Sequence, residues 1–386
     1  MSTAEPSDVY ARLGVRRVIN AYETVSRLGG TRIHPQVWAA MEAARDGFVD
    51  LRELHEAVGA RLAALTRNEA AAVTNGASAG LVLATVACAA RFDPDAVLQL
   101  TAPAVAGRPR PRVVVQRVHM SPYVQNVRQA GVDLVEVGYT QNATPEEQLA
   151  VALAPPTVAV LYTAGRPYER DGIGLERVVA LARARGVPVI VDAAALVPPA
   201  ENLWRFTERG ADLVVVSGGK GLHGPQDTGL VVGRAELVTT IQAVNAPIHG
   251  VGRAFKSTKE DVIGLVTAVE LTLEADEEAR YAALLRRAER VAQGLHGLPG
   301  LEVTVLPDGR QGQPCPRTLG RLEPGARVGR DELLQSLRDG DPMIVLGPYE
   351  DDANAFYVHP LGLTDDEAEV VIGRIRQLLT HANGRR

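Results

Sequence analysis

The feature that most constrains the fold is an alternation of short apolar runs and amphipathic stretches between residues 112 and 235. The runs have the length and β-branched content of buried strands, and the stretches between them have helical spacing. Repeated strand–helix–strand units imply a largely parallel sheet covered by helices on both faces, which is an α/β fold. The expected strands are Arg112–Gln116, Val132–Val137, Val158–Tyr162, Val187–Val191, Leu213–Val216 and Gly229–Val232, and the expected helices lie around Pro122–Ala130, Pro145–Ala152, Leu175–Arg185 and Asn202–Arg209.

The two ends of the chain have patterns that differ from this central part. With 386 residues the chain is too long for one compact core, so we expect two domains. Residues 1–35 look irregular, because glycine and proline interrupt them. After residue 256, one long helix or two joined helices lead into a smaller α+β region. We predict an N-terminal arm with a first helix over residues 1–45, a large domain over 46–250, and a linking helix with a small C-terminal domain over 251–386.

Charge and composition argue against several kinds of partner. The net charge of −5 argues against a nucleic acid bound through its phosphates. Two cysteines far apart in sequence, Cys88 and Cys315, give neither a disulfide framework nor a metal site. The first 20 residues carry charges without an apolar block, and no apolar stretch is long enough to span a bilayer. We therefore expect a cytoplasmic enzyme with no metal, nucleic acid or membrane partner.

Lys220 follows the predicted strand Leu213–Val216, on a turn that begins with Ser217 and two glycines. Three of the 41 basic residues are lysines, so an amine at this place is unusual for the chain. An amine can form a Schiff base with an aldehyde, whereas a guanidinium cannot. Lys220 is therefore a candidate for holding an aldehyde cofactor. The alternative is an ordinary surface lysine on a turn.

Three further features follow predicted strands, at the carboxyl ends where α/β sheets bind their ligands. The loop Thr74–Gly80 precedes a helix, and its backbone N–H groups could bind an anion or simply cap that helix. Asp192 follows the strand Val187–Val191 and could pair with a protonated pyridine nitrogen, or cap the next segment. His119 follows the strand Arg112–Gln116 and could lie flat on a planar cofactor, or be an ordinary core or surface histidine.

Together with Lys220, these features follow the chain order phosphate loop, ring-covering residue, pyridinium partner and amine. No single feature is specific, because glycine-rich turns before helices are common. Their order on an alternating strand–helix framework is much more restrictive. It points to pyridoxal 5′-phosphate as the cofactor.

At these residues the chain resembles the fold type I enzymes that depend on pyridoxal 5′-phosphate. Within them it is similar to the group of bacterial selenocysteine synthase and the D-glucosaminate-6-phosphate ammonia-lyases. The resemblance covers about residues 12–275 well and the C-terminal part loosely. The matching segments are Val18–Ala21, Leu28–Gly30, Phe48–Leu54, Val73–Gly80, Ala130–Gly138, Val191–Ala193, Ser217–Gln226 and Gly252–Glu260. The resemblance implies a mostly parallel sheet of the seven-stranded type, carrying the cofactor, and a smaller C-terminal α+β domain.

The resemblance also implies a role for each candidate residue. Lys220 would form the aldimine with the cofactor, Asp192 would be the partner of the pyridinium nitrogen, and His119 would cover the ring. The residues near the phosphate would be Asn75, Gly76, Ala77 and Ser217. We expect all of these residues to surround one cofactor.

Residues for the substrate are less sharply defined. Arg253 and Lys256 would lie near the active site and reach a neighbour's cofactor, because sites in this family form at a dimer interface. We therefore expect a homodimer or a larger homo-oligomer. Arg166 follows a predicted strand and is a candidate for binding an anionic group of the substrate, or else a solvated loop arginine.

Two departures from the family pattern concern the substrate. Many relatives in the wider fold bind the substrate α-carboxylate with an arginine in the C-terminal domain, but Met343–Pro348 contains none. Either Arg317, Arg321 or another residue would then take that role, or the substrate is unusual. Tyr22–Thr24 also replaces the small residues expected after Ile-Asn-Ala.

The resemblance implies a lyase that acts at Cα and Cβ of a polar amino acid or amino sugar acid and releases ammonia or water. The cofactor would stabilise a quinonoid carbanion at Cα, and the freed Lys220 would move the proton. The alternatives are a selenocysteine synthase-like β-replacement, racemisation, transamination or aldol cleavage. The acidic net charge and the lack of an obvious extra tRNA-binding domain count against selenium transfer. A hypothesis of a different class is a regulator that binds the cofactor without catalysis.

Overall fold

The structure is a computed structural model that describes residues 9–92, 110–139 and 143–380. These residues form two compact units, each with its own apolar core. The large unit comprises Arg32–Ala275 and Arg310–Gln313. The small unit comprises the described parts of Met1–Thr31, Asp276–Gly309 and Pro314–Arg386. The domain limits predicted at residues 45 and 250 stay a prediction.

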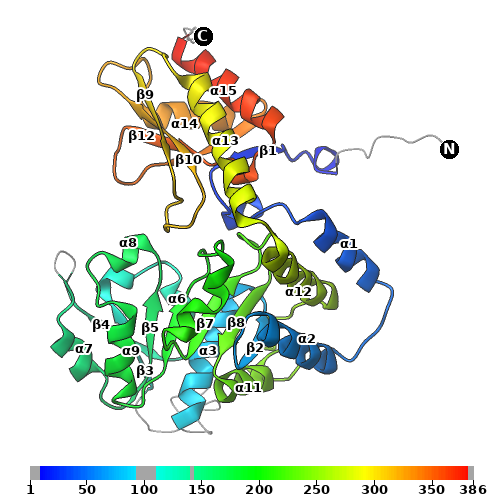
Figure 1. The fold of residues 1–386 in the computed structure, drawn as a ribbon, viewed down its shortest axis with the longest axis vertical. Coiled ribbons are helices and arrows are strands. Elements are labelled where there is room, and N and C mark those ends of the chain that lie inside the picture. Colours follow the sequence, from blue (N-terminus) through cyan, green and yellow to red (C-terminus); the bar gives the residue numbers. More distant parts are fainter. Residues whose placement is uncertain (1–8, 93–109, 140–142, 381–386) are drawn as a thin grey trace. The chain divides into compact units, whose positions relative to one another are not determined.

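A seven-stranded sheet forms the centre of the large unit (Figure 1). Its strands are β2 (Ala70–Thr74), β3 (Arg112–Gln116), β4 (Asp133–Val137), β5 (Thr157–Thr163), β6 (Val189–Asp192), β7 (Leu213–Ser217) and β8 (Gly229–Gly233). Across the sheet they lie in the order β2-β8-β7-β6-β5-β3-β4. Strand β8 runs antiparallel to both of its neighbours, and every other neighbouring pair is parallel. The mostly parallel α/β sheet predicted from the sequence is confirmed.

Helices cover both faces of this sheet because its strands are apolar on both sides. On β3, Val113 and Val115 pack into one apolar cluster and Val114 packs into the other. The first cluster includes side chains of α3 and α11, and the second includes side chains of α2, α9 and α12. The helices of this unit are α1 (Pro35–Ala44), α2 (Leu51–Leu65), α3 (Gly76–Phe92), α6 (Val124–Gln129), α7 (Glu146–Ala152), α8 (Arg166–Glu169), α9 (Leu175–Arg183), α10 (Arg205–Glu208), α11 (Ala235–Val244) and α12 (Lys259–Glu274).

In its described residues, the small unit contains a five-stranded sheet and three α-helices. Across the sheet the strands are β1 (Val18–Ala21), β11 (Met343–Pro348), β12 (Ala355–Val358), β10 (Arg317–Leu322) and β9 (Leu301–Leu306). Its helices are α13 (Glu277–Leu295), α14 (Arg330–Asp339) and α15 (Asp365–Thr380). Strand β1 is parallel to β11, and the other pairs are antiparallel.

The structure tests two expectations for the parts of the chain that flank the large sheet. The prediction that residues 1–35 are irregular is wrong at β1, because Val18–Ala21 pairs along its length with Met343–Leu346. Of the two options for the stretch after residue 256, the structure has two helices. The second helix, α13, directly follows Asp276, whose side chain accepts a hydrogen bond from the Ala279 N–H at 2.9 Å and so caps the helix.

Candidate active site

Lys220 lies on a close-packed glycine turn directly after β7. A side chain at Gly221 would place its Cβ 1.8 Å from the carbonyl oxygen of Val197. Only glycine fits at such a distance, so the turn holds the backbone beside Lys220 tightly against the neighbouring chain. The Lys220 side chain is half-buried, and its Nζ lies 5.7 Å from the centroid of the Tyr123 ring.

Asp192 ends β6, the strand beside β7, and Lys220 acts on it electrostatically. In the sheet, Asp192 lies opposite Val215 of β7. Its side chain is 8% exposed, and its Oδ1 accepts a hydrogen bond from the Ala194 N–H at 3.1 Å. Burial raises the pKa of Asp192, while this N–H and the positive charge of Lys220 act in the opposite direction. The fold thus brings Asp192 and Lys220 together at the carboxyl edge of the sheet.

His119 lies at the same edge but is completely enclosed. Its ring packs edge-on against Tyr162, with the ring centroids 4.4 Å apart and the planes at 80°. Neither ring nitrogen makes a hydrogen bond, and the ring has no exposed surface. Burial lowers the pKa of His119 to about 4, against a smaller opposing effect of the Tyr168 backbone. The imidazole is therefore neutral at neutral pH.

The His119 backbone is tied to the strand beside Asp192. Its carbonyl oxygen accepts a hydrogen bond from Thr163 Oγ1 at 3.0 Å, and Thr163 lies opposite Asp192 in the sheet. The structure therefore places His119 near the end of β5 and Asp192 at the end of β6. The imidazole of His119 has no exposed face, and covering a cofactor ring needs one.

Sequence reasoning missed Tyr123, which lies four residues after His119 in the same strand-to-helix connection. A lone tyrosine in a loop belongs to no periodic pattern, so its sequence gives no sign of a functional position. The one available signal was its place after the predicted strand Arg112–Gln116, where His119 also lies. Its nearness to Lys220 becomes visible only when β3 and β7 are placed in one sheet.

The candidate phosphate loop lies beside Ser217 because of the sheet register. Thr74 at the end of β2 and Ser217 at the end of β7 both lie opposite Gly229 of β8. Helix α3 begins at Gly76, whose φ of +74° suits glycine. A Cβ at Gly229 would lie 2.4 Å from the carbonyl carbon of Gly76, so this glycine lets the loop approach β8 closely. The predicted residues Asn75, Gly76, Ala77 and Ser217 therefore gather in one place.

A hydrogen bond joins the phosphate loop to the segment that carries Arg253 and Lys256. Asn75 Nδ2 donates to the Lys256 carbonyl oxygen at 3.0 Å. The side chains of Arg253 and Lys256 are exposed. The next residue, Ser257, is buried and its hydroxyl has no hydrogen-bonding partner.

The arginines considered for the substrate differ in their surroundings. Arg166 is exposed and begins α8, directly after β5, and its backbone N–H donates to the Gln311 carbonyl at 3.1 Å. In the small unit, Arg321 forms an ion pair with Asp352 at 2.8 Å. Arg317 is 6% exposed, and its guanidinium lies 4.8 Å from the centroid of the Tyr357 ring. Within the described part of the chain, no carboxylate pairs with Arg317.

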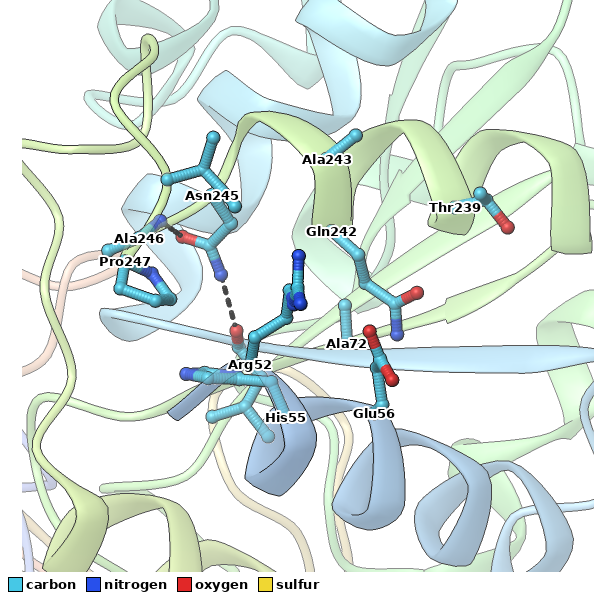
Figure 2. A pocket seen from close by; sticks show the side chains of 12 residues that line it. Arg52, His55, Glu56, Ala72, Thr239, Gln242, Ala243, Asn245, Ala246 and Pro247 are labelled. Atoms are coloured by element: carbon cyan, nitrogen blue, oxygen red, sulfur yellow. Dashed lines mark hydrogen bonds between the residues drawn. The ribbon is translucent and has the colours of Figure 1, made fainter. Parts of the chain in front are cut away.

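A cavity of about 360 Å³ in the large unit is separate from these residues (Figure 2). It lies between α2, β2 and α11, and Arg52 and His55 line it from the α2 side. Gln242 and Asn245 donate hydrogen bonds to backbone carbonyls of the edge strand β2, at 3.3 and 2.9 Å. These amides cover the outer edge of the sheet. None of the predicted site residues lines this cavity.

Residues 9–92, 110–139 and 143–380 contain no group of three or more His, Cys, Asp or Glu side chains placed to bind a metal ion. No helix in these ranges is long and apolar enough to cross a membrane. Both cysteines are buried and free. Burial raises the pKa of Cys315 to about 12, so this thiol stays protonated at neutral pH.

Comparisons with known proteins give consistent relatives. The family described as SelA: L-seryl-tRNA selenium transferase matches residues 122–296. A 5′-C-glycyluridine monooxygenase-decarboxylase from Streptomyces is 35% identical over 97% of this chain and 93% of its own length. D-glucosaminate-6-phosphate ammonia lyase from Salmonella typhimurium is 30% identical over 97% of this chain and 99% of its own length. The chain therefore belongs to the same family of pyridoxal phosphate enzymes as these two relatives.

Solved structures agree with this family membership. A structure of D-glucosaminate-6-phosphate ammonia-lyase is 28% identical, covers 98% of this chain and 99% of its own, and superposes with a TM-score of 0.83. The ureidoglycine-glyoxylate aminotransferase of Bacillus subtilis, at 15% identity and a TM-score of 0.60, shares the fold, covering 96% of this chain and 95% of its own. The fold type I class and the pyridoxal phosphate cofactor expected from the sequence are confirmed.

The residues of the large unit fit this cofactor. Asp192 is a buried carboxyl group with one hydrogen bond from the backbone and a pKa raised by burial. A positively charged partner at this carboxylate would offset its loss of hydration. The amine of Lys220 is close enough to act on this carboxyl group electrostatically. Gly229 lets the loop at Gly76 lie close to β8, and the backbone N–H groups at the start of α3 suit a phosphate.

Proposed function

We propose that this family member is a pyridoxal phosphate-dependent lyase that eliminates ammonia or water from a polar amino acid or amino sugar acid. The observation that carries the proposal is the Lys220–Asp192 pair at the carboxyl edge of the sheet. The relative from Salmonella typhimurium supports the reaction type, because its printed name is that of an ammonia lyase and it aligns over nearly the whole chain.

In this proposal each residue has a physical task. Bound pyridoxal phosphate supplies an electron sink for negative charge that develops at Cα of an amine substrate. The Asp192 carboxylate would keep a proton on the pyridine nitrogen, because a buried negative charge stabilises a positive one beside it. The Lys220 amine would hold the cofactor through its aldehyde group, and it would be placed to move a proton at Cα of the substrate.

The other predicted residues would bind and orient. Backbone N–H groups at Gly76 and Ala77, together with Asn75 and Ser217, would hold the phosphate. Arg166 would bind an anionic group of the substrate, since its guanidinium is exposed at the end of β5, next to the strand that carries Asp192. These assignments are supported by the sheet register and by the position of each residue at the end of a strand.

A second candidate function is oxygen-dependent decarboxylation. The observation in its favour is the 35% identity with the Streptomyces enzyme, which is named a monooxygenase-decarboxylase and acts on 5′-C-glycyluridine. A lyase and an oxygenase can use the same lysine and the same electron sink, so the residues discussed here serve both. The two reactions differ in their need for oxygen and in their products.

A substrate panel tests the proposal. Polar amino acids, amino sugar acids including D-glucosaminate 6-phosphate, and 5′-C-glycyluridine are incubated with the loaded enzyme in air and without oxygen. A lyase releases ammonia and a 2-oxo acid equally in both atmospheres, and Lys220→Ala releases neither. Carbon dioxide release that requires oxygen would support the second function instead. Racemisation or amino transfer without ammonia release would contradict both.

We also propose that the protein is a cytoplasmic homodimer. Two observations support the assembly. Active sites in the family that the chain resembles form between two subunits, and Arg253 and Lys256 are exposed on a segment bonded to the phosphate loop. Light scattering of the purified protein tests the assembly. A mass near twice 41.1 kDa is expected, and a monomer at working concentration would contradict it.

A further inference from the structure

The Tyr123 ring presents an aromatic face to Lys220. The Lys220 Nζ lies 5.7 Å from the ring centroid, within the range of about 6 Å over which a cation is attracted to a ring face. The Tyr123 carbonyl accepts a hydrogen bond from the Asn126 N–H at 2.9 Å. This bond fixes the residue at the start of α6, so its place beside Lys220 is set by regular structure.

Tyr123 and His119 differ in what they can offer to a ligand. Tyr123 is 51% exposed, so its ring is accessible to a ligand. His119 has no exposed surface, and its ring is held edge-on against Tyr162. An aromatic side chain can stack on a planar cofactor only where one of its ring faces is accessible. Tyr123 has such a face, and His119 does not.

We propose that Tyr123, not His119, supplies the aromatic wall of the cofactor site, and that its ring face stabilises positive charge on the Lys220 nitrogen. This inference rests on the proposed role of Lys220. It assigns the effect to the ring and not to the hydroxyl. His119 instead supports the site from within the core, by packing on Tyr162 and by accepting a hydrogen bond from Thr163.

The test compares Tyr123→Leu with Tyr123→Phe in enzyme loaded with pyridoxal 5′-phosphate. The readouts are the dissociation constant of the cofactor and the pH at which its visible absorbance band is half-titrated. Loss of the ring face is expected to weaken cofactor binding about tenfold and to lower the titration midpoint by about one pH unit. Tyr123→Phe keeps the face and is expected to stay within about twofold of the parent in binding.

Two controls make the result specific. Tyr139→Leu removes a tyrosine of similar exposure, 50%, whose hydroxyl accepts a hydrogen bond from Gln148, and it is expected to change neither readout. Two neighbours of Lys220 are retained in every variant: Asp192 on β6, which Lys220 affects electrostatically, and His223, whose N–H donates to the Lys220 carbonyl. A midpoint that changes in Tyr123→Leu but not in Tyr123→Phe therefore reports the ring.

Three outcomes would overturn the inference. The first is an unchanged Tyr123→Leu together with a shifted midpoint in His119→Leu. The second is a Tyr123→Phe variant as impaired as Tyr123→Leu, which would assign the effect to the hydroxyl. The third is an absorbance band that survives in Lys220→Ala, which would remove the proposed role of Lys220 as well. If Lys220→Ala loses the band while Tyr123→Leu is normal, only the role of Tyr123 is lost.

Discussion

Asp192 ends β6 and Lys220 follows the neighbouring parallel strand β7, and the charge of Lys220 opposes the rise that burial causes in the pKa of Asp192. The two residues are 28 positions apart in the chain, and the sheet register brings them to one edge. A buried carboxyl group without a full counter-charge is costly to ionise. The free protein therefore holds Asp192 in an environment that favours a positively charged ligand.

We predict that Asp192→Asn stabilises the cofactor-free protein at neutral pH. Because burial raises the folded-state pKa of Asp192, the folded protein keeps this proton to higher pH than the unfolded chain does. The associated stability is present below the unfolded pKa of 3.8 and is lost as pH rises through the folded value. Urea unfolding of the cofactor-free variant and parent should therefore diverge in favour of the variant from pH 4 to pH 7.

The exposed Asp351 supplies the control for this experiment. Asp351→Asn should follow the pH profile of the parent protein. Parallel profiles for Asp192→Asn and the parent would contradict the account, because they would mean that Asp192 titrates alike in the folded and unfolded states.

The same Asp192→Asn variant should bind pyridoxal 5′-phosphate more weakly, by a factor of about ten or more, since it removes a charge-assisted contact.

The buried histidines should make the protein sensitive to mild acid. Burial lowers the pKa of His119 to about 4 and that of His359 to about 3, where Arg317 adds to the effect. The unfolded chain takes up these protons near pH 6.5, so the stability is present above that pH and is lost as pH falls toward the folded values. For His119 alone the loss reaches about 3 kcal/mol.

Unfolding between pH 7 and pH 4 tests this expectation with His119→Leu. Neither ring nitrogen of His119 has a hydrogen-bonding partner, so leucine removes no bond there. The variant should lose less stability than the parent as the pH falls. A variant with the pH dependence of the parent would show that His119 is not buried in neutral form.

Gly221→Ala should disrupt the turn that carries Lys220. The new Cβ would lie 1.8 Å from the Val197 carbonyl oxygen, so the backbone must move, at an expected cost of about 3 kcal/mol or more. Gly373→Ala is the matched control, because its Cβ would meet nothing within 4 Å and it lies inside α15. That change should stabilise the protein by up to about 1 kcal/mol. Thermal unfolding of the two variants tests this expectation. Equal unfolding midpoints for Gly221→Ala and Gly373→Ala would contradict the close packing of the turn.

Much of the large unit was predictable because its strands are buried on both faces. Continuous runs of valine, as in β3 and β7, mark such strands without knowledge of their partners. Lys220 and Asp192 could be found for the same reason, since each follows such a run. The antiparallel direction of β8 carries no such signal, because a buried strand has the same composition in either direction.

The remaining features depend on contacts between distant parts of the chain. Strand β1 has four residues, and it becomes a strand by pairing with β11, more than 300 residues later. The enclosure of His119 depends on Tyr162, which comes from a different strand. The position of Tyr123 beside Lys220 depends on the order of strands in the sheet. Local sequence patterns do not contain this information.

The central claim is that Lys220 holds pyridoxal 5′-phosphate, and one labelling experiment tests it directly. The chain contains three lysines, Lys220, Lys256 and Lys259, so borohydride reduction of the loaded protein followed by peptide mass analysis distinguishes three candidate side chains. The account predicts that the reduced cofactor is found on the peptide with Lys220, and that Lys220→Ala loses both the label and the visible absorbance band. A label on Lys256 or Lys259, or a band that survives in Lys220→Ala, would contradict it.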